Sequence, residues 1–258
     1  GLLAVGAPGD DEYDQDAGAV YTFVLRDNRA PAMGVISGSD FTRSTEDEPL
    51  DTMPTARAGS VVALAQASDS DGDACGMAVI GLEGAGGKWQ FTGDGEHWND
   101  FGGASSANAR LLGPSARIRF VPDADFSGAV RPGITFRAWD QTTGFSTGIG
   151  DARQFGGATA FSEQSETWGW DVTPVNDRPF VRPVGFPRLP DIWGNILDQY
   201  NNGQSVSNLL QDVVTDVDGD ACGLAAIGVS ETSGRWQYST DAGTTWRPLT
   251  ALSVLNAR

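Results

Sequence analysis

An acidic stretch occurs twice in this chain: DSDGDACG at residues 69–76 returns as DVDGDACG at residues 216–223. The match continues downstream, where WQF at residues 89–91 aligns with WQY at residues 236–238. This repeat is much longer than a solenoid turn or a propeller blade of about 40–50 residues, so each copy corresponds to a whole domain.

The repeat predicts three segments along the chain. Residues 1–33 form an unrepeated segment, residues 34–177 a complete repeat, and residues 178–258 a second, incomplete repeat. The second repeat ends at Arg258, the counterpart of Arg110, and so lacks a counterpart of residues 111–177. We expect either a truncated chain or completion by a neighbouring copy. In the second case, the runs at residues 2–7 and 19–25 of one copy would add to the open sheet edge of the second repeat in a neighbouring copy. Such a head-to-tail contact would build a filament.

The composition favours an all-β fold. Hydrophobic residues make up 40% of the chain, and glycine and proline are spread through it. In the run 117–121, Ile118 and Phe120 alternate with arginines, which is typical of a half-buried antiparallel strand. We predict strands at residues 60–64, 77–80, 88–91, 117–121, 134–139 and 167–172. About seven such strands between Gly/Pro/Asp turns predict an antiparallel β-sandwich. A helical turn is expected near residues 198–202, and a surface loop at residues 145–157.

The net charge of −17 makes nucleic acid an improbable partner, because phosphates would be repelled. No apolar run approaches the roughly 18 residues of a membrane span, so membrane insertion is not expected. Cys75 and Cys222 occupy the same place in the two repeats and are expected to be small, buried and apolar. An intermolecular disulfide is the alternative for them.

The repeated acidic loops are candidate cation sites. Three carboxylates within five residues repel one another unless a cation lies among them, and oxygen ligands on a Gly-containing turn favour Ca²⁺. An EF-hand is excluded because Ile80 stands where a bidentate glutamate is needed. The alternative is a solvated acidic turn. The candidate ligands in the loops are Asp69, Asp71 and Asp73, and Asp216, Asp218 and Asp220.

The sequence VTPVNDRP at residues 172–179 closely resembles the linker of cadherin-like domains in large bacterial surface proteins. TEDEP at residues 45–49 resembles the entry of such a repeat, and FRAWD at residues 136–140 its penultimate strand. The resemblance implies tandem Ig-like β-sandwiches outside the cell. In cadherins the linker shares Ca²⁺ with an Asp-x-Asp of the next domain. Asn176 and Asp177 would then join the loop at residues 216–220.

By the same resemblance, Asp140 and the acidic run 46–48 are further candidate ligands. The second repeat departs from the family at its entry, where LPDI at residues 189–192 replaces the acidic run.

Two further motifs are structural. STDAGTTW at residues 239–246 matches the Asp-box of sialidases, a hairpin turn in which the aspartate caps turn amides. The first repeat contains a degraded version of this motif, which ends in DGEHW at residues 94–98. Residues 3–9 and 18–23 resemble the latter part of an FG-GAP propeller blade. One half-blade cannot close a propeller, so the five acidic residues at positions 10–16 are expected to form a solvated loop.

No catalytic pattern stands out, because the single histidine, His97, lies in the degraded Asp-box turn. Acidic pairs are plentiful, but no feature singles out a glycosidase pair. We therefore expect a non-enzymatic, Ca²⁺-binding structural or adhesive module of a large surface or filament-forming protein. Its partners would be Ca²⁺, neighbouring copies, and cell-surface glycans or proteins. The alternative is an accessory or carbohydrate-binding region of a secreted glycan hydrolase, using Trp168, Trp170 or Trp193.

Overall fold

The structure of the chain is a computed structural model, which describes residues 2–7, 19–24, 27–37, 41–183 and 187–257. Strands predominate and helices are short, so the predicted all-β class is confirmed. The chain forms two compact units, unit 1 (Gly1–Val175) and unit 2 (Asn176–Arg258). Each unit is described by itself.

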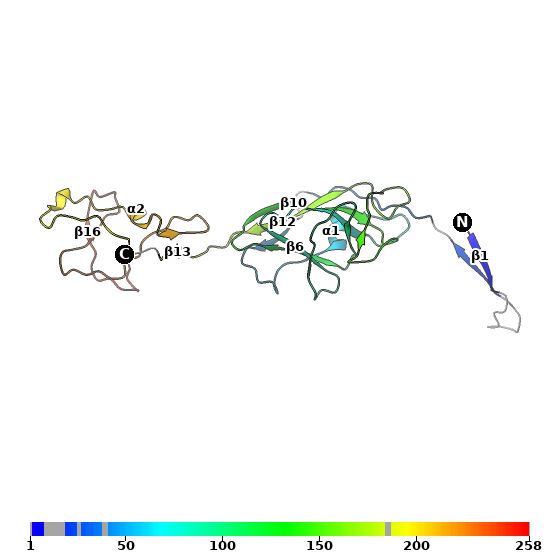
Figure 1. The fold of residues 1–258 in the computed structure, drawn as a ribbon, viewed down its shortest axis with the longest axis horizontal. Helices are drawn as coiled ribbons and strands as arrows, with labels where there is room; N and C mark the ends of the chain where they lie inside the picture. The colour runs from blue at the N-terminus through cyan, green and yellow to red at the C-terminus, as the bar shows by residue number, and fades with distance from the viewer. Residues whose placement is uncertain (1, 8–18, 25–26, 38–40, 184–186, 258) are drawn as a thin grey trace. The chain divides into compact units, whose positions relative to one another are not determined.

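Unit 1 contains a six-stranded and a four-stranded sheet (Figure 1). The larger sheet has the order β11 (Ile149–Gly150), β8 (Ala109–Leu112), β5 (Gly76–Leu82), β10 (Gly128–Trp139), β12 (Glu166–Thr173) and β3 (Thr42–Thr45). The smaller sheet has the order β4 (Ala56–Arg57), β9 (Arg117–Pro122), β6 (Gly87–Thr92) and β7 (Asn99–Asp100). Neighbouring strands are antiparallel except β12 and β3, which are parallel.

The main core of unit 1 takes side chains from both sheets. Ile118 and Phe120 of β9 are fully buried in it, as their alternation predicts. Trp89, Trp168 and Trp170 pack together there, with ring centroids 5.6–5.9 Å apart. The remaining predicted strands of this unit are confirmed as parts of β5, β6, β10 and β12.

The prediction of a strand at residues 60–64 is wrong, because this run belongs to helix α1 (Ala58–Leu64). The buried residues of this segment are Ala58, Val61, Val62 and Ala65, a spacing that puts them on one face of a helix. That packing outweighs the preference of the two valines for strands.

The outer face of the larger sheet carries a second, smaller core around Trp139, Leu111 and Phe161. The segment between β10 and β12 covers this face, and Arg137 anchors it through hydrogen bonds to the carbonyls of Ser162 (2.9 Å) and Glu163 (2.5 Å). The predicted loop at residues 145–157 lies in this segment and includes only the two-residue strand β11.

The N-terminal strands β1 (Leu2–Ala7) and β2 (Ala19–Val24) pair with each other and with no other strand among the described residues. The acidic residues at positions 10–16 lie outside the described residues. After this hairpin, residues 28–36 make contacts with the sheets and core of unit 1. Ala30 N–H donates to the carbonyl of Gly157 (2.8 Å), and Met33 and Ile36 are buried in the main core.

Unit 2 has little regular structure. Its two-stranded sheets are β13 (Phe180–Val181) with β14 (Val214–Thr215), and β15 (Gln237–Tyr238) with β16 (Arg247–Pro248). The expected turn at residues 198–202 is confirmed by a 3₁₀ turn, η1 (Asp198–Tyr200). Helix α2 (Val206–Leu210) has Ser205 as its N-cap, whose hydroxyl accepts the N–H of Asn208.

Unit 2 reproduces several of the hydrogen bonds found within residues 28–110. The β13–β14 pair Phe180–Thr215 corresponds to the bridge between Ala32 and Ser68. The β15–β16 pairing corresponds in the same way to β6–β7. Residues 176–258 therefore align with residues 28–110, and the structural repeat begins at Asn28 and again at Asn176.

Candidate metal sites

In unit 1 the side chain of Asp69 folds over its own turn. Asp69 Oδ1 accepts the N–H of Asp71 (2.7 Å), and the Asp69 carbonyl accepts the N–H of Gly72 (3.3 Å). Gly72 has φ +87°, which a residue with a side chain adopts only at a cost. The second carboxylate oxygen of Asp69 is buried and accepts no hydrogen bond from the described residues. An oxygen of this kind is costly to desolvate unless a donor or a cation meets it.

The sheet register brings Asp140 to this loop. Trp139 at the end of β10 pairs with Gly76 at the start of β5, so Asp140 lies at the same end of the sheet as Cys75. Burial, followed by the carboxylates of Asp69, Asp140 and Asp73 in that order, raises the pKa of the Cys75 thiol to about 11. All three carboxylates therefore lie close enough to the Cys75 thiol to influence it.

Asp140 is 2% exposed and is held from two sides. Its Oδ2 accepts the side-chain amide of Asn28 (2.9 Å), and its Oδ1 accepts both the N–H and the hydroxyl of Thr142 (2.8 and 2.6 Å). The segment entering the unit also reaches the loop directly, because Arg29 N–H donates to Asp71 Oδ2 (2.7 Å).

Unit 2 has the same arrangement at its repeated loop. Asp216 Oδ1 accepts the N–H of Asp218 (3.1 Å), and the Asp216 carbonyl accepts the N–H of Gly219 (3.3 Å). Asp177 N–H donates to Asp218 Oδ2 (2.7 Å), in the manner of Arg29 and Asp71. The structure thus brings Asp177 to the loop, whereas the side-chain amide of Asn176 donates to the Asp177 carbonyl (2.8 Å).

The third aspartates of the loops, Asp73 and Asp220, are exposed. Their backbone carbonyls instead accept weak contacts from the thiols of Cys75 (3.9 Å) and Cys222 (3.7 Å). Both cysteines are free thiols of intermediate exposure, and Cys75 packs against the main core.

Sequence reasoning missed Asn28 and Arg29. Their signal is visible in the sequence, because DNRAP at residues 27–31 corresponds to NDRP at residues 176–179. Of the acidic run 46–48, Glu46 is buried, and its Oε1 accepts the N–H of Val175 (2.6 Å), the last residue of unit 1.

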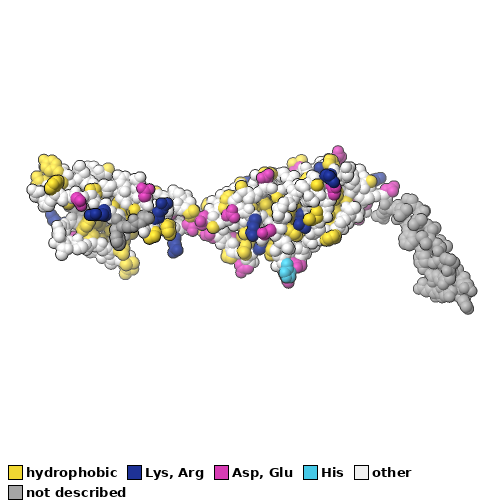
Figure 2. Space-filling model, in the orientation of Figure 1, with side chains coloured by type: hydrophobic (Ala, Val, Ile, Leu, Met, Phe, Trp, Pro, Cys, Tyr) yellow, Lys and Arg dark blue, Asp and Glu magenta, His cyan; other side chains and the backbone are white. Residues whose placement is uncertain are grey.

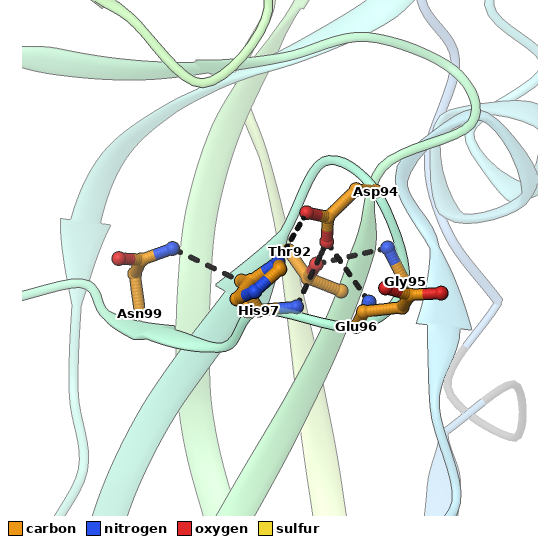
Figure 3. Close-up of polar contacts among 6 residues, drawn as sticks. All are labelled: Thr92, Asp94, Gly95, Glu96, His97 and Asn99. Carbon is orange, nitrogen blue, oxygen red and sulfur yellow. Dashed lines mark hydrogen bonds and ion pairs between the residues drawn. The ribbon is translucent and has the colours of Figure 1, made fainter.

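The degraded Asp-box turn between β6 and β7 keeps its capping function (Figure 3). Asp94 Oδ1 accepts the N–H groups of Glu96 (2.9 Å) and His97 (2.8 Å), and Asp94 Oδ2 lies 2.7 Å from His97 Nδ1. These bonds, first the amide of His97 and then that of Glu96, lower the pKa of Asp94 well below its usual range.

The second Asp-box, between β15 and β16, has matching bonds. Asp241 Oδ1 accepts the N–H of Thr245 (2.8 Å), and Asp241 Oδ2 accepts its hydroxyl (2.6 Å). His97 therefore occupies the place of a threonine in a hairpin turn, and the predicted capping role of both aspartates is confirmed.

The tryptophans considered for carbohydrate binding have different environments. Trp168 and Trp170 lie in the core at 1% and 0% exposure, so they cannot form a binding surface, whereas Trp193 is 82% exposed. No helix in the described part of the chain has the length and apolar character needed to cross a membrane.

Comparison of the chain with protein-family models, with curated proteins and with solved structures gives no match. The resemblance to cadherin-like repeats therefore stays a prediction that rests on the motifs quoted above.

Proposed function

We propose that this chain is a calcium-binding structural or adhesive module of a larger extracellular or cell-surface protein, built from tandem cadherin-like β-sandwich repeats. The observation that carries the proposal is a duplicated arrangement. In each unit, an aspartate loop accepts the backbone N–H of the segment that leads into that unit. A solvated acidic turn would not need this second segment.

The charges of these loops favour a bound cation. Among the described residues, Asp69, Asp73 and Asp140 take part in no ion pair, although Asp140 is almost fully buried. The same holds for Asp216, Asp218 and Asp220 in unit 2. Carboxylate and carbonyl oxygens on a flexible loop suit Ca²⁺, which accepts six to eight oxygen ligands in irregular geometry. Mg²⁺ demands near-octahedral geometry and fits such a loop less well.

A cation at Asp177 and Asp218 would act at the point where the chain enters unit 2. Glu46 binds the amide of Val175, two residues earlier in the chain, and Pro174 and Pro179 already restrict the backbone on either side. An ion here would remove freedom from this short segment. Its role would be mechanical: to stiffen successive repeats so that they project an adhesive or assembly surface.

Isothermal titration calorimetry on chelator-stripped full chain tests calcium binding. We expect heat on addition of Ca²⁺ and much less on addition of Mg²⁺. The double variant Asp69→Asn/Asp71→Asn should abolish calcium binding at the loop of unit 1. The double variant Asp216→Asn/Asp218→Asn should abolish it at the loop of unit 2. Absence of both heat and a change in melting temperature at millimolar Ca²⁺ would contradict the proposal.

Small-angle scattering with and without chelator tests the mechanical role separately. Calcium should narrow the distribution of molecular dimensions in the natural chain but not in Asp218→Asn. Calcium binding with identical scattering curves would leave a metal site without a stiffening function.

A further inference from the structure

Unit 2 exposes side chains whose counterparts in unit 1 form the core. Trp89 is 4% exposed and Met77 is fully buried, whereas their counterparts Trp236 and Leu224 are 42% and 51% exposed. Ile227 is 56% exposed. Hydrophobic side chains are visible on the surface of this unit in Figure 2. An apolar surface of this kind marks an interaction site.

The exposed tryptophan is nevertheless held as in the folded repeat. Trp236 Nε1 donates to the carbonyl of Ser230 (2.8 Å), as Trp89 Nε1 does to the carbonyl of Glu83 (2.8 Å). The Trp236 carbonyl accepts the N–H of Leu249 (2.9 Å), matching the bond to Trp89 from Phe101 (3.1 Å). The local geometry of the core is therefore present in unit 2, and what differs is the layer that covers it.

Three glycines of unit 2 point to the same missing neighbours. In unit 1 a Cβ added at Gly87 would overlap the carbonyl of Val121 in β9 and the ring of Phe120, and one at Gly76 would meet the carbonyl of Leu112 at 2.5 Å. A Cβ added at Gly81 would lie 3.2 Å from the Cβ of Thr135 in β10, a tight contact without overlap. Their counterparts are Gly234, Gly223 and Gly228, and a Cβ there would meet no atom within 4 Å.

In unit 1 the covering layer consists of strands β9, β10 and β12. β10 is antiparallel to β5, with Phe136 opposite Val79 and Ala138 opposite Met77, while β9 is antiparallel to β6. The segment 223–229 of unit 2 aligns with β5 but forms no strand, because no strand neighbour lies beside it among the described residues.

We propose that unit 2 is a strand acceptor, and that its occupant is a polypeptide segment repeating the pattern of residues 111–175. A strand of the β10 type would add antiparallel to residues 223–229, and one of the β9 type to residues 234–239. Transfer of the unit 1 register places the β10 positions 136 and 138 opposite Ala226 and Leu224. This proposal does not depend on calcium binding.

The hairpin β1–β2 of a second copy fits this surface less well. Each of its strands has six residues, whereas β10 has twelve. Its sequence contains no tryptophan, although Trp168 and Trp170 fill the equivalent space in unit 1. A free-standing two-stranded hairpin also supplies fewer strands than the three that cover the core of unit 1.

The test compares a protein of residues 1–258 with the same protein extended after Arg258 by a copy of residues 111–175. The control extension has the same composition but a reordered β10 segment. In it, the residue copied from position 134 changes places with that from 135, 136 with 137, and 138 with 139. This exchange turns the apolar set to the opposite face of the strand. Hydrogen exchange is measured at residues 223–229 and 234–239, and exchange in β5 of unit 1 serves as the internal standard.

We expect the extension to slow exchange at both segments on the order of tenfold or more, and the control extension to slow it far less. Equal exchange in all three proteins would overturn the proposal. Concentration-dependent protection in the unextended chain that is lost on deletion of residues 1–24 would also overturn it, because the occupant would then be the hairpin of a second copy.

Discussion

Replacement of Asp140 by asparagine separates a cation site from a purely structural network. Asparagine keeps an oxygen for the N–H of Thr142, and the amide of Asn28 can turn to present its own oxygen to the new NH₂ group. The variant also loses one charge close to Asp69 and Asp73. In chelator we therefore expect its stability to stay within about 1 kcal/mol of the natural chain.

The response to calcium should differ between the two proteins. A ligand at 100 times its Kd stabilises the folded state by about 2.7 kcal/mol. For a unit of this size, about 1 kcal/mol shifts the melting temperature by about 2–4 °C, so calcium should raise it by about 5–11 °C. If Asp140→Asn weakens binding about tenfold, the same calcium concentration stabilises by only about 1.4 kcal/mol, which halves the shift.

Near-UV circular dichroism is a suitable assay, because Trp89, Trp168 and Trp170 are buried together in unit 1 and report its unfolding. Asp125→Asn is the matched control: Asp125 is exposed and has φ +59°, a conformation that asparagine tolerates. The same calcium shift in Asp140→Asn and in the natural chain would refute the assignment of Asp140. So would a large loss of stability in chelator, which would indicate a structural role alone.

Two further predictions use positions that the repeat duplicates. Gly87→Ala should destabilise unit 1 by about 1–3 kcal/mol, because the added methyl group overlaps β9. Gly234→Ala, at the equivalent position of unit 2, should leave the melting curve unchanged. Equal effects of the two substitutions would contradict the alignment of the two units. The pKa of Asp241 is lowered to about 2, first by the hydroxyl of Ser239 and then by Thr245. Because this lies below the ordinary value near 3.9, the stabilisation of this turn is present above about pH 4 and is lost as the pH falls toward 2. An NMR titration of the Asp241 carboxyl should show this midpoint, and Ser239→Ala should raise it; a midpoint near 4 in the natural chain would contradict the capping geometry.

The features that sequence reasoning predicted are those determined by a few neighbouring residues. The capping aspartates of the two hairpin turns are an example, since all their partners lie within four positions. The alternation of Ile118 and Phe120 likewise needs no knowledge of the partner strand. The run 60–64 failed because five residues are too few to distinguish a strand from a helix, and only the burial of Ala58 and Ala65 reveals the helical spacing.

The candidate site in unit 1 depends on contacts that are distant in the sequence. Asp140 reaches the loop through the register of β10 on β5, which spacing alone does not give; only the resemblance to cadherin-like repeats pointed to it. Asn28 lies outside the complete repeat that the sequence predicts, which begins at residue 34. Its contact with Asp140 spans 112 residues, so no local pattern could predict it.

The two proposals are coupled through Asp140. In unit 1 this carboxylate comes from the end of β10, the strand type whose counterpart unit 2 lacks in residues 176–258. The loop at residues 216–220 therefore has no counterpart of Asp140 within residues 176–258, although Asp177 lies beside it where unit 1 has Arg29. A strand added to residues 223–229 in the register of β10 would bring the missing carboxylate to that loop. Strand addition and calcium binding would then strengthen each other by the same factor, because the coupling free energy between two sites is reciprocal.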